Sequence, residues 1–136
     1  MDSPQAQGKP VEFNIQIGDE LTQNVMPLMH EIRHALRQLI ETGETSIIDL
    51  RSIPLAPGEE STLLEQLGTG EVQVTINAMG PSEITETRYT GVWLVSHYNE
   101  ERSILGRFIE ITRAPEILLA QQEDMALSLQ LLENDL

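Results

Sequence analysis

The sequence predicts an α+β fold, a mostly antiparallel sheet with helices packed on it. Three features indicate this class: a long amphipathic helix near the start, several β-rich segments in the middle, and a helical segment at the end. We expect a three-strand meander with one or two more strands in the same sheet. A length of 136 residues with 40% hydrophobic residues suits one globular domain.

The first 22 residues are expected to form a flexible tail, followed by a single domain over residues 23–136. Within the tail, residues 11–17 alternate apolar and polar side chains. Such alternation is typical of a strand with one buried face, and it predicts one additional strand. The tail has no basic region followed by an apolar region, so we expect no secretory signal.

Residues 24–42 are predicted to form the long helix. Apolar residues recur there every three or four positions and make one stripe, formed by Val25, Leu28, Met29, Ile32, Ala35, Leu36, Leu39 and Ile40. Pro27 is tolerated near a helix start, and Gly43 is suited to a helix end. After this helix we expect a short buried strand over residues 46–53 and a short helix over residues 59–67.

The middle of the chain is predicted to form the meander, from residues 72–78, 83–98 and 104–113. The second of these segments is either one long strand or two strands joined at Gly91, where a β-bulge is expected. Pro115 ends the third segment, because proline cannot donate to a strand ladder.

The final helix is expected over residues 116–134, packed on the sheet. One apolar stripe is formed by Leu118, Met125, Leu129, Leu132 and Leu136, and a second flank by Ala120, Leu127 and Leu131. This apolar arc is wider than a single contact with a core requires. The helix is therefore either wedged between two layers or in contact with another subunit or a client protein.

Composition excludes several classes of function. The formal charge of −14, from 8 Lys and Arg against 22 Asp and Glu, argues against binding to nucleic acid or to an anionic membrane surface. The chain has no cysteine, which excludes disulfides, thiolate metal ligands and a cysteine nucleophile. No stretch approaches the roughly 20 apolar residues of a membrane span. We therefore expect a cytoplasmic protein with no nucleic-acid and no membrane partner.

Residues 30–34 read HEIRH, which matches the H-E-x-x-H signature of zinc proteases. That chemistry needs two histidines one helical turn apart in a cleft, with the glutamate as base. Helical spacing instead puts His30 and His34 opposite the apolar stripe, with Arg33 and Arg37 beside them. Guanidinium groups oppose binding of a dication. We predict no metal and no cofactor here, and keep a metal-dependent hydrolase using this segment as an alternative.

Two further features allow more than one interpretation. Arg33 and Arg37 are two of only eight Lys and Arg residues in the chain, and both lie on one side of the predicted helix. That side is either a docking stripe for an acidic partner or a solvated face balanced by nearby glutamates. Trp93, the only tryptophan, is either an anchor of the sheet core or an aromatic that contacts a partner. The candidate partner-binding residues are thus Arg33, Arg37, Trp93, Leu127 and Leu131.

No catalytic residues are predicted, and the chain is not expected to be an enzyme. Carboxylates lie in or beside predicted strands at Glu71, Glu83, Glu86 and Glu110. Nothing in their spacing brings two of them to the fixed separation that acid–base chemistry needs. No nucleophile-elbow sequence surrounds the polar residues Ser82, Ser96 and His97.

From His30 onward, about four-fifths of the chain, the sequence resembles the HupH/HyaF-type hydrogenase expression proteins, in particular their C-terminal conserved domain. The matching stretches are HEIRHALRQLIETGE (30–44), IDLRSIPLAPGE (48–59), LLEQLGTGEV (63–72), GPSEITETRYTGVWLV (80–95) and RFIEITRAPEIL (107–118). The most specific part is GPSEITET followed by TGVW, at the matching distance after LGTGEV.

The resemblance implies an accessory role in cytoplasmic maturation of NiFe-hydrogenase. Such proteins act as assembly chaperones or scaffolds for a small- or large-subunit precursor, alongside other maturation factors, and are not known as enzymes. Many relatives are much longer and carry an additional N-terminal region, so functions that need that region are not implied here.

Small-subunit precursors carry basic twin-arginine leaders, which an acidic surface would attract. Binding of such a leader or precursor is therefore our main functional hypothesis. Two alternatives to this hypothesis are kept. One is the metal-dependent hydrolase, and the other is a plain oligomerisation or regulatory module that forms a homo-oligomer through the last helix.

Overall fold

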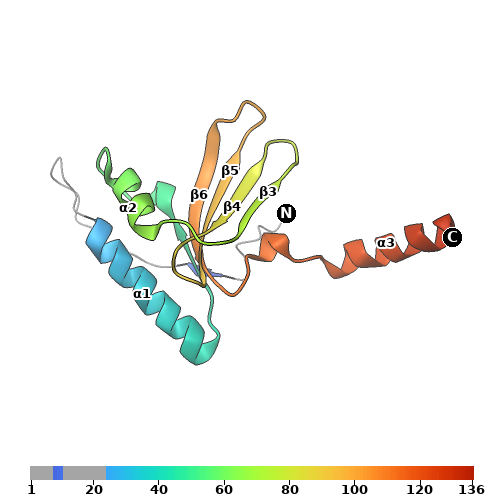
Figure 1. Ribbon diagram of the computed structural model, residues 1–136, viewed down its shortest axis with the longest axis horizontal. Helices are drawn as coiled ribbons and strands as arrows, with labels where there is room; N and C mark the ends of the chain where they lie inside the picture. Colours follow the sequence, from blue (N-terminus) through green and yellow to red (C-terminus); the bar gives the residue numbers. More distant parts are fainter. Residues whose placement is uncertain (1–7, 11–23) are drawn as a thin grey trace.

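The computed structural model describes residues 8–10 and 24–136 of the chain. Figure 1 shows a sheet with helices on one side and a separate helix extending from the other. The elements, with η for 3₁₀ helices, are β1 (Lys9–Pro10), α1 (Val25–Thr42), β2 (Ser46–Asp49), η2 (Leu50–Ser52), α2 (Glu59–Leu67), β3 (Gln73–Ile76), β4 (Ser82–Glu86), β5 (Val92–Tyr98), β6 (Ile104–Ile111), η3 (Glu116–Leu118) and α3 (Gln122–Asp135).

The described strands form one six-stranded sheet in the order β1-β2-β6-β5-β4-β3. The last four strands along the chain are a continuous antiparallel meander, and β2 adds to its β6 edge, also antiparallel. Only β1 runs parallel to its neighbour, β2. The prediction of an α+β fold with a mostly antiparallel sheet is confirmed.

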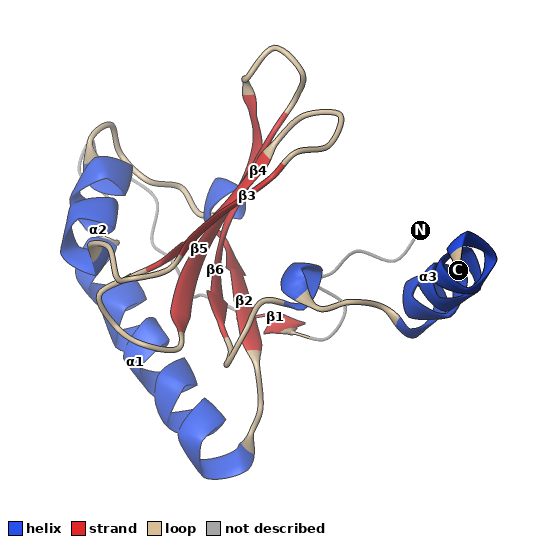
Figure 2. Ribbon diagram, turned by 45° about the vertical axis from the view of Figure 1, so that its right-hand side comes forward, coloured by secondary structure: helices blue, strands red, loops and turns tan. Residues whose placement is uncertain are grey.

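One face of the sheet is covered by α1 and α2 (Figure 2). Alternation along the strands sends Ile109 and Ile111 of β6, and Val92 of β5, into this layer. The helices meet them with Leu28, Ile32 and Ala35 of α1 and with Leu63 and Leu67 of α2. This cluster is the main core of the domain.

The opposite face carries a smaller cluster. Ile84, Trp93 and Val95 are buried there. Along β5 the side chains of Trp93 and Val95 alternate with the ones that point into the main core. The segment that covers them is η3, through Ile117 and Leu118. This face therefore depends on one short 3₁₀ turn where the first face has two helices.

The junction of α1 and α2 is held by buried polar groups. Asn24, at the start of α1, is 5% exposed, and its Nδ2 donates to the carbonyl oxygen of Pro54 at 3.0 Å. Its backbone N–H donates to Glu59 Oε2 at 3.0 Å, while Glu59 Oε1 accepts from the N–H of Ala56 at 2.6 Å. One carboxylate thus ties the first turn of α2 to the start of α1.

The segment over residues 83–98 is two strands, one of the two arrangements that the sequence allowed. They are joined by a turn in which Gly91 has a φ of 95°, a left-handed conformation that favours glycine. The bulge expected at Gly91 is instead an irregularity of β5 against β6 between His97 and Tyr98.

The final helix differs from expectation in two ways. Leu119 and Gln121 take extended backbone, so the predicted helix 116–134 is divided into η3 and α3. Moreover, α3 does not pack on the sheet: every residue from 121 to 136 is exposed, and both figures show α3 standing away from the domain. The expectation of packing was wrong because an apolar stripe identifies a surface to be covered and not what covers it.

The strand predicted over residues 11–17 lies outside the described residues. Lys9 and Pro10 are described, and they pair with Ser46 and Ile47 of β2. In the part of the chain that the structure describes, none of the helices has the length and apolar character to cross a membrane.

The core assignment predicts contrasting effects of two identical truncations. Leu28 on α1 is fully buried, so Leu28→Ala should lower the free energy of unfolding by about 2–5 kcal/mol. Leu105 on β6 is 64% exposed, and Leu105→Ala should change it by about 0.5 kcal/mol or less. Urea denaturation of both variants measures the difference. Equal effects would contradict the placement of α1 on the sheet.

Candidate protein-binding surfaces

The outward side of α1 is fixed by its buried side. Because Leu28, Ile32 and Ala35 face the sheet, helical periodicity turns the side chains between them outward. The residues exposed there are His30, Arg33, His34 and Arg37. The structure therefore places the predicted basic stripe on the surface, as helical spacing indicated.

An apolar groove runs along the edge of this stripe. It encloses about 290 Å³ and is lined by Met29, His30, Ile32, Arg33, Leu36, Tyr89 and Val92, which we call the α1 groove. Tyr89 comes from the β4–β5 turn, so the groove lies between the helix and the sheet. The guanidinium of Arg88 lies over the Tyr89 ring, 5.4 Å from its centroid. The groove thus has an apolar floor and a cationic rim.

The HEIRH histidines lie on this surface rather than in a catalytic cleft. Both His30 and His34 are exposed, and His30 contributes to the rim of the α1 groove. Among the described residues, no three His, Asp or Glu side chains come together as metal ligands would. The geometry gives no support to the zinc-hydrolase alternative.

Helix α3 presents apolar side chains on two sides. Met125, Leu129, Leu132 and Leu136 follow one another at steps of four, three and four residues and form what we call the first α3 face. Their exposed fractions range from 48% to 96%. Leu127 and Leu131 point to the other side, are 64% and 63% exposed, and form the second α3 face. The parts of the two expected flanks that lie in and directly after α3 are therefore at the surface, whereas Leu118 of the first flank lies in η3 and packs on the smaller cluster.

Trp93 does not share this exposure. It is 7% exposed, packs in the smaller cluster with Ile84 and Val95, and donates its Nε1–H to the carbonyl oxygen of Thr112 at 3.1 Å. The structure gives it the role of a core anchor, one of the two interpretations that the sequence left open. We therefore leave Trp93 out of the proposed contact surfaces.

The sheet brings together one pair that sequence reasoning did not connect. Ser82 and His97 are cross-strand neighbours on β4 and β5, and Ser82 Oγ lies 2.7 Å from His97 Nδ1. The imidazole packs edge-on against Phe108, and burial lowers its pKa. A catalytic serine–histidine pair also needs a group that orients the imidazole, and no described residue hydrogen-bonds its Nε2. We interpret the pair as a structural cross-strand bond.

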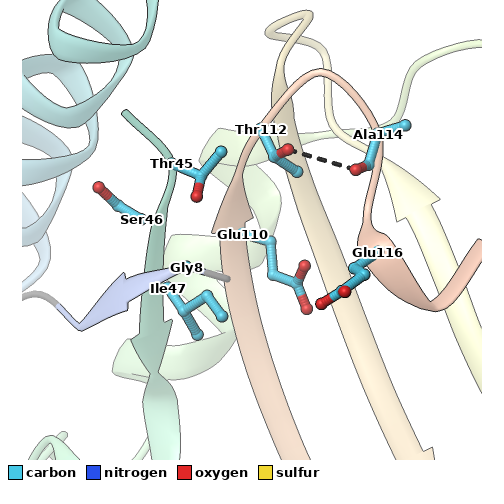
Figure 3. A pocket seen from close by; sticks show the side chains of 8 residues that line it. All are labelled: Gly8, Thr45, Ser46, Ile47, Glu110, Thr112, Ala114 and Glu116. Atoms are coloured by element: carbon cyan, nitrogen blue, oxygen red, sulfur yellow. Dashed lines mark hydrogen bonds between the residues drawn. The ribbon is translucent and has the colours of Figure 1, made fainter. Parts of the chain in front are cut away.

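A second pair of polar side chains meets where η3 covers the sheet. Glu110 of β6 is only 6% exposed and points toward Glu116 of η3 in a small pocket (Figure 3). Burial, and then the negative charge of Glu116, raise the pKa of Glu110 to about 7. The sequence suggested no partner for Glu110, because the second carboxylate arrives through the turn after β6.

The two surfaces that carry the predicted contact residues lie far apart. In both ribbon views α1 is on one side of the domain and α3 extends from the opposite side (Figures 1 and 2). Arg33 and Arg37 are thus not brought together with Leu127 and Leu131 within one chain.

Residues 22–136 match the family described as the C-terminal conserved region of HupH hydrogenase expression protein. The chain belongs to the HupH family. It is also similar to a solved structure of hydrogenase expression protein HupH from Thiobacillus denitrificans, with 40% identity and a TM-score of 0.76, covering 83% of this chain and 97% of that one. The match of both sequence and fold supports the resemblance seen in the sequence.

Curated relatives carry consistent names. The chain is 29% identical over 101 residues to hydrogenase expression/formation protein HupH of Rhizobium leguminosarum bv. viciae, covering 74% of this chain and 36% of that protein. It is 28% identical over 107 residues to hydrogenase-1 operon protein HyaF of Escherichia coli, covering 79% and 37%. The HupH chain thus spans little more than a third of the length of these relatives.

The buried Glu110 predicts how stability of this HupH domain depends on pH. Its pKa is about 7 in the folded protein against 4.5 ordinarily, so the folded state binds the proton more tightly. Stability should therefore fall as pH rises from about 4.5 to about 7, by an amount on the order of 3 kcal/mol.

Glu110→Gln removes this titration. The variant should match the original chain near pH 4.5 and exceed its stability at pH 8, as measured by urea denaturation across the pH range. Glu101→Gln, in the exposed β5–β6 turn, is the matched control and should leave the pH profile as it is. If the Glu110→Gln profile remained parallel to that of the original chain, burial of the ionised carboxylate would not be the cause.

Proposed function

We propose that this domain is a non-catalytic accessory factor in NiFe-hydrogenase maturation that binds a hydrogenase subunit precursor in the cytoplasm. The observation that carries the proposal is membership of a family whose curated relatives are named hydrogenase expression/formation proteins. Because the chain spans about a third of those relatives, the proposal concerns the part that this domain plays.

The second α3 face is the surface that we assign to the precursor. Leu127 and Leu131 are exposed on a helix that stands away from the domain, where an extended polypeptide can reach them. Exposed contiguous apolar side chains are typical of sites that bind other proteins. The arrangement suits a chaperone, because an incompletely folded client offers apolar segments that a folded one has buried.

Charge determines which apolar segments this surface would favour. Helix α3 carries Glu123, Asp124, Glu133 and Asp135 and no basic residue, on a chain with a formal charge of −14. A segment that combines basic and apolar residues, as in the leader of a hydrogenase small subunit, is complementary to it. Arg33 and Arg37, on the far side of the domain, offer a separate surface for an acidic partner or another maturation factor.

The test is capture of the precursor by the tagged chain from cells that produce a NiFe-hydrogenase, with partners identified by mass spectrometry. We expect an unprocessed hydrogenase subunit to be recovered. The double variant Leu127→Asp and Leu131→Asp should reduce its recovery at least tenfold, because each aspartate places a charge in the apolar contact. Leu105→Asp, at an exposed position of β6, is the matched control and should retain the precursor.

Two results would count against this proposal. If the capture recovered no hydrogenase subunit and no maturation factor, the proposed client would be wrong. If the double variant and the Leu105→Asp control recovered equal amounts of precursor, the second α3 face would not be the contact surface.

Salt provides an independent measurement on the purified pair. If acidic side chains carry the attraction, affinity for a basic leader peptide should fall steadily as ionic strength rises, since salt screens exposed charges over about 10 Å at 0.1 M. A leader peptide with its arginines replaced by glutamine should bind more weakly at low salt. If the affinity did not change with salt, the apolar contacts of Leu127 and Leu131 would provide it without the acidic side chains.

A further inference from the structure

We propose that α3 of one copy of this chain docks, through its first face, along the α1 groove of a second copy. The proposal is independent of the hydrogenase role, because it rests only on the surfaces of this chain. It uses the side of α3 opposite Leu127 and Leu131, which leaves the second α3 face available to a client.

Helix α3 needs a surface that covers its apolar side. It is a 14-residue helix in which no residue is buried. Isolated helices shorter than about 12–15 residues are marginally stable in water, and most helical stability in proteins comes from packing an apolar side. The four large side chains of the first α3 face supply such a side, and all four are exposed, from 48% to 96%.

Helix α1 presents an exposed apolar stripe of similar length. Beyond the Met29 and Leu36 side chains of the groove, Met26 and Ile40 are 58% and 77% exposed. Met26, Met29, Leu36 and Ile40 are separated by three, seven and four positions, so they lie on the same side of the helix and continue the groove along it. At 1.5 Å per residue the stripe from Met26 to Ile40 is about 21 Å long, and the first α3 face is about 17 Å long.

The charges of α3 and of the α1 groove are complementary. Helix α3 bears four acidic residues and no basic one, whereas Arg33 lines the groove and Arg88 lies over Tyr89. Arg37 is exposed one helical turn beyond Arg33. Neither Arg33 nor Arg37 forms an ion pair with any residue of the described ranges 8–10 and 24–136. Docking of α3 would bring carboxylates to these free guanidinium groups.

The geometry points to a second copy rather than to the same chain. The views in Figures 1 and 2 place α1 and α3 on opposite sides of the domain. Only Leu119, Ala120 and Gln121 connect η3 to α3, and three residues span at most about 11 Å. Because each copy has one groove and one helix, two copies can exchange α3 reciprocally and close a symmetric dimer.

Sedimentation velocity of the full chain over about a hundredfold range of concentration tests the proposal. We expect a dimer that dissociates on dilution. Leu129→Asp on the first α3 face and Ile40→Asp beside the groove should each weaken the dimer at least tenfold. Leu131→Asp, on the second α3 face, is the matched control and should leave the dissociation constant unchanged. All three residues are more than half exposed, so the variants should remain folded, which circular dichroism checks.

Mixing distinguishes docking in the groove from pairing of two α3 helices. The Ile40→Asp chain keeps an intact α3 and the Leu129→Asp chain keeps an intact groove, so the mixture should associate more tightly than either variant alone. A strict monomer at every concentration would overturn the proposal. So would an unchanged dimer in Ile40→Asp together with dissociation in Leu129→Asp, because that outcome identifies contact between two α3 helices.

Discussion

The packing of α1 against β5 and β6 is the contact on which the rest of the structure depends. Leu28 and Ile32 of the helix meet Ile109 and Val92 of the sheet, and all four are buried. Because burial of these side chains sets the rotation of the helix, it also decides which residues of α1 reach solvent. The basic stripe and the α1 groove are consequences of this one apolar interface. The bond network around Asn24 then fixes where the helix begins.

The two faces of the sheet are covered very unequally. Helices protect the main core, while the smaller cluster around Trp93 is closed by the single turn η3. The same turn carries Glu116 toward the buried Glu110, so the element that completes the second face also brings two carboxylates together. Protonation of Glu110 relieves the desolvation of its carboxylate and its repulsion by Glu116. Protonation of Glu110 therefore favours the packed arrangement of η3, and Glu110 is the one ionisable side chain that is buried among the described residues.

Helix α3 explains how one small domain could combine recognition with assembly. The proposed dimer pairs its first face with the apolar stripe of α1 in another copy, while Leu127 and Leu131 lie on the opposite side of α3. Separation of the two apolar faces means that the leucines proposed for the client are not the side chains proposed for the dimer. The family's name associates it with hydrogenase expression, and the proposed dimer would leave the second face of each α3 exposed to a precursor segment.

The sequence alone determined the element types, since they follow from local periodicity and from glycine and proline positions. Residues 59–67 and the first long helix were predicted almost to the residue. The resemblance carried by GPSEITET and TGVW also identified the family. Only the tertiary structure decided the strand order, the burial of Trp93, the meetings of Ser82 with His97 and of Glu110 with Glu116, and the exposure of α3. These depend on contacts between segments distant in the chain. An apolar stripe shows that a surface will be covered, but the packing of the whole domain determines whether its own core covers it.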